Sequence, residues 1–258
     1  MKLGEKAAAG GYRVESFDAL GSSNDEAMSR LVKSRIEPGD PGRLWIVAGE
    51  QFRGRGRLGR EWRSPPGNLY ASLLLVDPSP PAMSSQLGFV AGVALFSALQ
   101  SILGDDRRLK LKWPNDALHN GAKLSGLLLE GARRPNGLFG CVIGFGVNCL
   151  SSPDDAPYPT TSLQKIGAAT PDRQALFAAL SDAMALWLDI WSRSQNFAAV
   201  RAAWLECAGG LGGPVSVNRN GIAREGFFRG IDAQGRMLLE TPNGLMETIE
   251  AGDVSLAR

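Results

Sequence analysis

An arginine- and glycine-rich segment, residues 51–62, has the composition of an anion-binding loop. Between Gln51 and Arg60 the sequence places four arginines and three glycines and no acid, so we expect uncompensated positive charge there. Glycines let a backbone approach a ligand closely, and guanidinium groups and exposed N–H groups bind oxyanions such as phosphate. The segment therefore predicts a site for an anionic ligand.

Two other interpretations fit the same segment. It could be a solvated surface loop whose arginines keep the protein soluble. It could also be an arginine-glycine contact to nucleic acid, of the kind found in disordered segments. Apolar, strand-like runs at residues 44–48 and 69–76 bound the segment closely, which favours a loop held between two core strands over a disordered tract.

A carboxylate and an ammonium are predicted to meet further along the chain, at Asp116 and Lys123. Asn120-Gly121 is a signal for a two-residue hairpin turn, which would place Leu118 opposite Lys123 and Asp116 on the same side. Such diagonal neighbours lie roughly 7–8 Å apart. An ordinary cross-strand ion pair, worth about 0–1 kcal/mol, is one interpretation. The other is a catalytic pair presented to an anionic reactant and its metal.

Hydroxyl and amide side chains precede the first clear helix, which begins near Ala27. Ser23 or Asn24 is predicted to cap this helix, with Glu26 as the acid that reaches back. A helix N-terminus beside such groups can also offer hydrogen-bond donors to a ligand.

Gly144 and Gly146 are expected on one face of a strand at residues 138–149. Glycines inside a strand mark close approach by something else. Either a planar ligand group lies on this flat floor, or a bulky neighbouring side chain packs there.

The surrounding pattern predicts a mixed α and β chain. A buried helix is expected at residues 84–103, an amphipathic helix opening at Thr170-Pro171, and another helix at about 195–207. After the glycine-rich residues 209–214, several short strands with tight turns indicate a small SH3-like barrel. We expect a flexible tail at residues 1–11, a catalytic domain at 12–208 and a C-terminal domain at 209–258.

Composition limits the classes of function. The net charge of +2 gives no overall field for nucleic acid or membrane, so anion recognition must be local. Three widely spaced cysteines suggest neither disulfides nor a zinc site, and the single histidine excludes histidine-rich metal centres. The N-terminus lacks a signal peptide pattern, and residues 84–103 favour a core helix over a membrane span. We expect a cytoplasmic protein.

Taken together, these motifs resemble the biotin protein ligases. The resemblance spans nearly the whole chain and is carried by five motifs in the family's order: Ser22-Ser23-Asn24, Gly54-Arg55-Gly56-Arg57-Leu58-Gly59-Arg60 with Gln51 and Trp62, Lys112-Trp113-Pro114-Asn115-Asp116, Lys123-Leu124-Ser125-Gly126, and Gly144-Phe145-Gly146-Val147-Asn148. Phe52 and Arg53 depart from the pattern, because many members carry smaller residues there. With the first strand starting near Tyr12, no helix-turn-helix is expected ahead of the catalytic region, as in a monofunctional ligase.

The resemblance implies an α+β fold: a mixed β-sheet with helices on one side, like class II aminoacyl-tRNA synthetases, plus a small C-terminal SH3-like barrel. It implies that biotin and ATP, with Mg²⁺, form biotinyl-5'-AMP, and that a lysine of a biotin carboxyl carrier protein, such as that of acetyl-CoA carboxylase, then displaces AMP. No DNA or membrane partner is expected, and the protein would be a monomer or a homodimer.

The resemblance also implies roles for individual residues. Arg57, Lys123 and Asp116 would be catalytic, and Asp116 would be a candidate ligand for Mg²⁺. The residues expected to contact biotin are Ser22, Ser23, Asn24, Gln51, Arg55, Gly56, Arg57 and Lys123. Those expected to contact the nucleotide are Arg55, Arg57, Trp62, Gly144, Gly146 and Asn148. A lipoate–protein ligase and a nucleic-acid-binding module that uses the arginine-glycine loop remain the alternatives.

Overall fold

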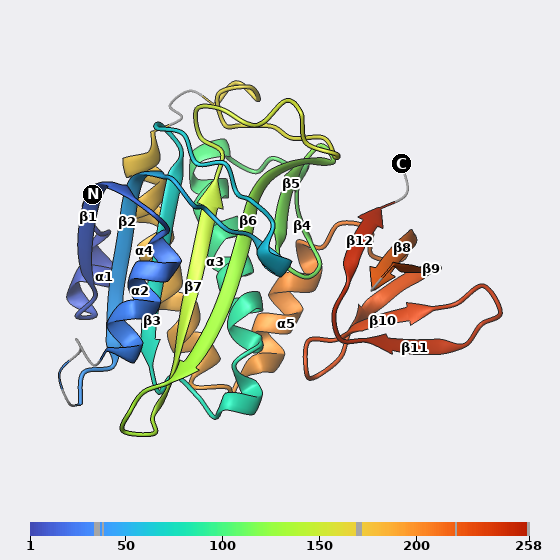
Figure 1. Cartoon of the computed structure of the whole chain (residues 1–258). Helices are drawn as coiled ribbons and strands as arrows, with labels where there is room; N and C mark the ends of the chain where they lie inside the picture. Colours follow the sequence, from blue (N-terminus) through green and yellow to red (C-terminus); the bar gives the residue numbers. More distant parts are fainter. Residues whose placement is uncertain (34–36, 38, 169–171, 220, 257–258) are drawn as a thin grey trace.

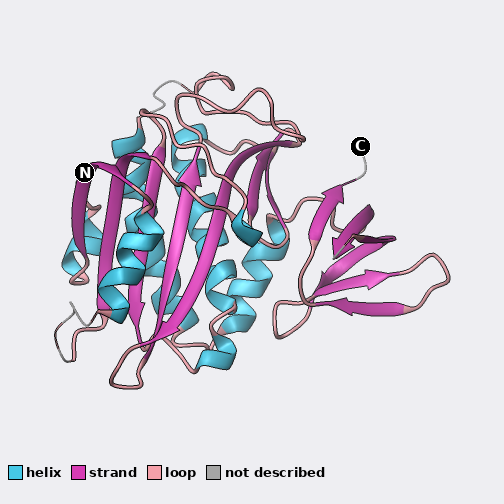
Figure 2. Ribbon diagram, in the orientation of Figure 1, coloured by secondary structure: helices cyan, strands magenta, loops and turns pink. Residues whose placement is uncertain are grey.

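Two β-sheets form the frame of the protein, and helices pack around the larger one (Figures 1 and 2). The computed structural model describes residues 1–33, 37, 39–168, 172–219 and 221–256. The larger sheet has the order β1-β2-β3-β7-β6-β5-β4, in which β1 and β2 are parallel and the other neighbours antiparallel. Its strands are β1 (Arg13–Leu20), β2 (Gly42–Gln51), β3 (Leu69–Val76), β4 (Leu109–Lys112), β5 (Asp116–His119), β6 (Ala122–Arg133) and β7 (Phe139–Val147).

Alternating side chains give this sheet two apolar faces. Trp45 and Val47 face the main core, which is covered by α1 (Glu5–Ala9), α3 (Gln86–Leu103), α4 (Arg173–Trp191) and α5 (Phe197–Glu206). Leu44 and Ile46 face the other way, against α2 (Ser23–Val32). Figure 1 shows α2 in front of the sheet and α3 and α4 behind it. The predicted fold class is confirmed, with α2 as an additional helix on the second face.

Helix α3 is a core helix, as its sequence predicts. Its 18 residues have a mean hydropathy of 1.6, and by length and composition such a helix could cross a membrane. However, 67% of it is buried inside the protein, against the sheet and α4. The amphipathic helix α4 begins at Arg173 with Asp172 as its N-cap, and the expected opening at Thr170-Pro171 lies outside the described residues.

The N-terminal segment is not a flexible tail, and that prediction is wrong. Residues Glu5–Ala9 form α1, which packs on α4. The Gly4 amide donates to Ser181 Oγ at 2.9 Å, and the Ala7 amide donates to Asp182 Oδ1 at 2.9 Å. These acceptors are more than 170 residues away, so local composition could not reveal them.

Two of the three cysteines are buried free thiols. Cys141 and Cys149 lie in the core, and burial raises the pKa of each thiol to about 12. Cys207 is partly buried, and burial raises its pKa to about 11. All three thiols are therefore protonated at neutral pH, as expected of packing residues.

The C-terminal residues form a five-stranded antiparallel sheet that shares the main core. Its order is β11-β10-β9-β8-β12, and within the described residues it ends at β11 and β12 without closing into a barrel. Its SH3-like character otherwise fits the prediction. Trp204 of α5 packs against Phe89 of α3 and Phe228 of β9, with ring centroids 5.5 and 6.4 Å away. The strands are β8 (Pro214–Arg219), β9 (Ile222–Ile231), β10 (Met237–Glu240), β11 (Met246–Ile249) and β12 (Asp253–Leu256).

Candidate active site

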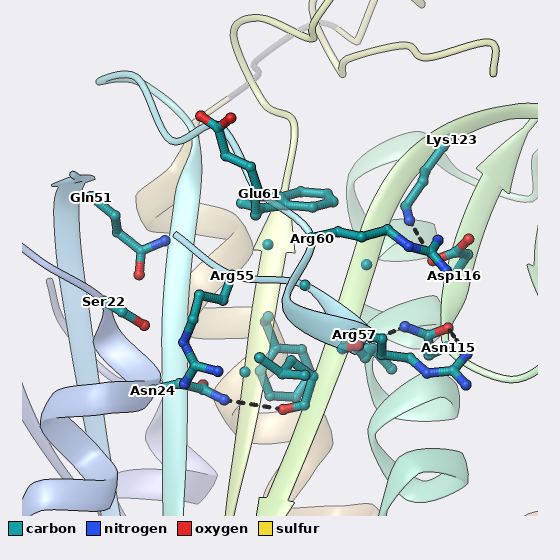
Figure 3. Close-up of a pocket in the computed structure, with 18 of the residues that line it drawn as sticks. Ser22, Asn24, Gln51, Arg55, Arg57, Arg60, Glu61, Asn115, Asp116 and Lys123 are labelled. Carbon is teal, nitrogen blue, oxygen red and sulfur yellow. Dashed lines mark hydrogen bonds and ion pairs between the residues drawn. The ribbon is translucent and has the colours of Figure 1, made fainter. Parts of the chain in front are cut away.

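One cavity on the α2 face of the large sheet collects twelve of the thirteen residues expected at the site. It holds about 740 Å³ of empty space, including solvent at its mouth. Ser22, Asn24 and Gln51 lie at one end, Asn115, Asp116 and Lys123 at the other, and Arg55 and Arg57 between them (Figure 3). The other expected residues that line it are Ser23, Gly56, Trp62, Gly144 and Gly146.

Asn148 is the expected residue that does not line this cavity. Its Nδ2 donates to the Thr161 carbonyl at 3.0 Å, and its backbone amide donates to the Leu124 carbonyl. Asn148 instead lines a neighbouring cavity, which shares Trp62 and Lys123 with the first. Its expected contact with the nucleotide therefore stays a prediction.

The arginine-glycine loop is folded over the sheet between β2 and β3. Isolated β-bridges pair Gln51 with Ser64 and Arg55 with Glu61, so the loop is a distorted hairpin that is held at both ends. The indole ring of Trp62, in this loop, packs directly on Gly146 of the sheet. A Cβ atom placed on this glycine would be only 2.5 Å from the ring. In this structure a neighbouring side chain, and not a free surface, covers the glycine.

Two of the loop's four arginines, Arg55 and Arg60, are paired with carboxylates, contrary to expectation. Arg55 pairs with Asp25 at 2.5 Å and with Glu130 at 3.1 Å, and Arg60 pairs with Asp253 of the C-terminal sheet. Hydrogen bonding to Glu130, and then to Asp25, raises the pKa of Arg55 above its ordinary value. The guanidinium groups of Arg55 and Arg60 therefore already contact carboxylates in this structure.

Arg57 differs from these neighbours because its partners are neutral. Its Nη1 donates to Asn115 Oδ1 at 3.2 Å (Figure 3). The same Nη1 donates to the Gly252 carbonyl at 3.4 Å. Among the residues that the structure describes, Arg57 forms no ion pair, so no carboxylate lies in direct contact with its guanidinium group. Of the loop arginines lining the cavity, Arg57 is thus the best placed to meet an anion.

The polar end of the cavity is built on the N-terminus of α2. Ser22 is the N-cap, accepting from the Asp25 amide at 3.4 Å, so the prediction of Ser23 or Asn24 as the cap is wrong. The Ser23 amide donates to Gln51 Oε1 at 2.7 Å. Asn24 Oδ1 accepts from Ser72 at 2.6 Å, and its Nδ2 donates to Glu130 at 2.9 Å. These contacts fix the direction of each side chain at this end.

Asp116 and Lys123 meet as predicted, with 2.7 Å between Nζ and Oδ1 (Figure 3). The hairpin pairs Leu118 with Lys123, and a β-bulge between Ala117 and Leu118 places Asp116 opposite Gly126, so the long Lys123 side chain spans the remaining distance to the carboxylate. Lys112 contacts the other oxygen of Asp116 at 3.2 Å. The Asp116 side chain is only 9% exposed. Two ammonium groups balance the charge of this mostly buried carboxylate.

This arrangement does not fit the expected role of Asp116 as a metal ligand. Both of its oxygens face lysines, and no group of three or more metal-binding side chains occurs among the described residues. A protein-held Mg²⁺ needs carboxylate oxygens free to coordinate it. The carboxylate instead lies between the ammonium groups of Lys112 and Lys123.

Several cavity residues carried no signal in the sequence. Glu130 lies within β6, Asp253 is the first residue of β12 in the C-terminal sheet, and Tyr158 lies in a loop of prolines and aspartates. Asp253 and Tyr158 line the cavity, and Glu130 pairs with Arg55 at its edge. Asn115, Arg60, Gly126 and Phe145 also line the cavity, and these could have been found because they belong to the motifs of the sequence.

Comparison with known proteins gives matches along the whole chain. Residues 22–148 match the Biotin/lipoate A/B protein ligase family, and residues 210–257 match the Biotin protein ligase C terminal domain. A biotin–[acetyl-CoA-carboxylase] ligase of Paracoccus denitrificans is 37% identical, over 90% of this chain and 96% of the relative. The bifunctional ligase/repressor BirA of Escherichia coli is 29% identical, over 95% of this chain and 74% of the relative.

Solved structures agree with these matches. The biotin protein ligase of Aquifex aeolicus in complex with biotin and ATP superposes with a TM-score of 0.78 at 26% identity. The match covers 95% of this chain and 99% of that one. The apo structure of the same Aquifex protein gives a TM-score of 0.74 at 22% identity, which shows the shared fold.

Proposed function

Because the chain belongs to the biotin protein ligase family, we propose that its cavity joins biotin to a lysine of a biotin carboxyl carrier protein by way of biotinyl-5'-AMP. In the first step the biotin carboxylate attacks the α-phosphorus of ATP and pyrophosphate leaves. In the second step the lysine amine attacks the acyl carbon, an amide forms and AMP leaves. The complex of the Aquifex relative with biotin and ATP supports these two substrates.

The two ends of the cavity suit the two ends of biotin. We propose that Ser22, Ser23, Asn24 and Gln51 contact the ureido group, because their hydroxyl and amide groups can both donate and accept. Lys123, at the opposite end, would then meet the carboxylate. Arg55 and Gly56 would line the path between these ends, and Trp62, Gly144, Gly146 and Asn148 would surround the nucleotide.

The observation that carries the proposal is the convergence of Arg57 and Lys123 on one cavity. Two anions must approach each other to form the mixed anhydride, so fixed positive groups are needed at the place where charge develops. Arg57 has only neutral partners, and Lys123 has one buried carboxylate partner that holds it in place. The folded loop would also exclude water from the reactive adenylate.

Mg²⁺ is proposed to arrive with the phosphates of ATP, because Asp116 is occupied by two lysines. The bound ion would offset phosphate charge. The protein itself would offset phosphate charge with two cationic side chains, Arg57 and Lys123.

The carrier protein is the proposed macromolecular partner, and the compartment is proposed to be the cytoplasm. The Paracoccus relative, matched along 96% of its length, is named for ligation alone, which supports ligation without DNA binding. The proposed oligomeric state is a monomer or a homodimer.

Biotin-dependent exchange between ATP and labelled pyrophosphate tests the function directly. We expect exchange with biotin and little or none with lipoate, since the polar groups at the α2 end would lose their ureido partner. Exchange that prefers lipoate would support a lipoate ligase instead. Oligonucleotide binding with a steep salt dependence, unaffected by ATP and biotin, would support the nucleic-acid-binding alternative.

Replacing Arg57 by glycine is expected to weaken retention of the adenylate more than its formation. The substitution removes the bonds to Asn115 and to the Gly252 carbonyl, which tie the loop to the Lys112–Asp116 motif and to the C-terminal sheet. The off-rate of biotinyl-5'-AMP, followed with labelled biotin, should rise by about tenfold or more, as for the loss of one charged hydrogen bond of about 1.5–3 kcal/mol.

Arg63→Gly is the matched control for this variant. Arg63 is also a loop arginine, but it is 55% exposed and pairs with Asp155 outside the first cavity. We expect its adenylate off-rate to equal that of the unmodified protein. An unchanged off-rate in Arg57→Gly would contradict the proposed role of Arg57.

A further inference from the structure

The backbone around Lys123 is held by the segment that follows β7. The Lys123 amide donates to the Pro159 carbonyl at 2.8 Å, and the Thr161 amide donates to the Lys123 carbonyl at 3.0 Å. These two bonds form a parallel β-bridge between Lys123 and Thr160. Tyr158 immediately precedes this bridge, so its place relative to Lys123 is fixed through the backbone.

The Lys123 ammonium lies near two aromatic rings. Its Nζ is 5.3 Å from the ring centroid of Tyr158 and 5.5 Å from that of Trp62, within the range of cation–π attraction. The same Nζ contacts Asp116 Oδ1 at 2.7 Å. The lysine side chain is 17% exposed, so these contacts act on a charge that is largely removed from water.

Aromatic rings and a carboxylate hold an ammonium in different ways. A carboxylate oxygen accepts a hydrogen bond from an N–H group. An aromatic ring attracts the positive charge through its π face and does not occupy an N–H donor in this way. A lysine has three N–H donors. Asp116 Oδ1 lies at ion-pair distance from Nζ, and the rings can hold Nζ in place while its N–H donors stay available for oxygens of a reactant.

Tyr158 also lies where two cavities meet. Trp62, Lys123 and Tyr158 line both the first cavity and the neighbouring one of about 680 Å³. The three side chains therefore form part of the wall between them. A lysine in this wall could turn toward either cavity if one of its contacts were lost.

We propose that Tyr158 is a positioning residue that keeps the Lys123 ammonium directed into the first cavity. The inference rests on the proposed function, in which Lys123 meets the carboxylate and phosphate oxygens during adenylate formation. Tyr158 itself need not touch the substrates for this role. The aromatic ring of Tyr158 performs this role, and the hydroxyl group is not needed for it.

The test compares Tyr158→Leu with Tyr158→Phe in biotin-dependent ATP–pyrophosphate exchange. Loss of the ring should lower kcat for exchange by roughly 3- to 30-fold, the range of one cation–π contact. Tyr158→Phe keeps the ring and should stay within about twofold of the unmodified protein. Asp154→Asn, a change in the same loop at an 89% exposed side chain, controls for disturbance of the loop and should have no effect.

A double-mutant cycle separates positioning from a general structural role. If Tyr158 acts through Lys123, then adding Tyr158→Leu to Lys123→Met should cost no more than about twofold, because the group it positions is gone. Equal losses in both backgrounds, or full activity of Tyr158→Leu alone, would overturn the proposal. Full activity of Lys123→Met would instead contradict the proposed function of Lys123, so the two failures can be told apart.

Discussion

Biotinyl-5'-AMP formation is expected to slow by roughly 10²–10³-fold when Lys123 is replaced by alanine, the loss seen when one oxyanion-hole donor is removed. Lys123 is the ammonium that lines the cavity opposite the polar end, and it is held there by Asp116, Tyr158 and Trp62. Without it, negative charge that develops during attack on the α-phosphorus loses a fixed partner. The measurement is the initial rate of biotin-dependent pyrophosphate exchange at saturating ATP.

Two further variants make this result specific to the ammonium. Lys123→Met keeps most of the side-chain volume and should show the same loss as alanine. Lys165→Ala removes a lysine that also forms a 2.7 Å ion pair, with Asp154, but on the surface and outside the cavity. Its exchange rate should match the unmodified protein. A normal rate of exchange in Lys123→Ala would remove Lys123 from the mechanism.

Substitution of Trp204 by alanine is expected to lower the free energy of unfolding by about 3–5 kcal/mol, as for other large buried aromatics. Trp204 is 2% exposed and packs between α3 and the C-terminal sheet, against Phe89 and Phe228. Its loss would leave a cavity at the junction between the two sheets. Urea unfolding followed by far-UV circular dichroism measures the change.

Phe227→Ala is the contrast for this prediction. Phe227 is next to Phe228 in β9 but is 38% exposed, so its loss should cost no more than about 1 kcal/mol. Because both sheets share one core, we also expect a single unfolding transition. Two separate transitions, with Trp204→Ala affecting only one, would show that the two sheets unfold independently. The predicted boundary at residue 209 would then also separate two units of stability.

Local patterns were sufficient for most of the secondary structure. Alternation and apolar runs predicted β2, β3 and the hairpin of β5 and β6, since each signal depends on residues within a few positions of one another. The hairpin at Asn120-Gly121 also predicted that Asp116 and Lys123 would meet. The N-terminal helix was missed because Gly4 and Ala7 find their partners in α4.

From the sequence motifs we predicted twelve residues that one cavity brings together in the structure. The order of the motifs along the chain also indicated the family. Spacing along the chain was enough for this, because the motifs lie at strand ends and turns whose local structure their own residues dictate. Only the tertiary structure showed that Arg55 and Arg60 are neutralised by Glu130 and Asp253, whereas Arg57 is not. It also brought Tyr158 to Lys123. Such pairings join segments from 35 to 193 residues apart, and their energy depends on distances that exist only once the chain has folded.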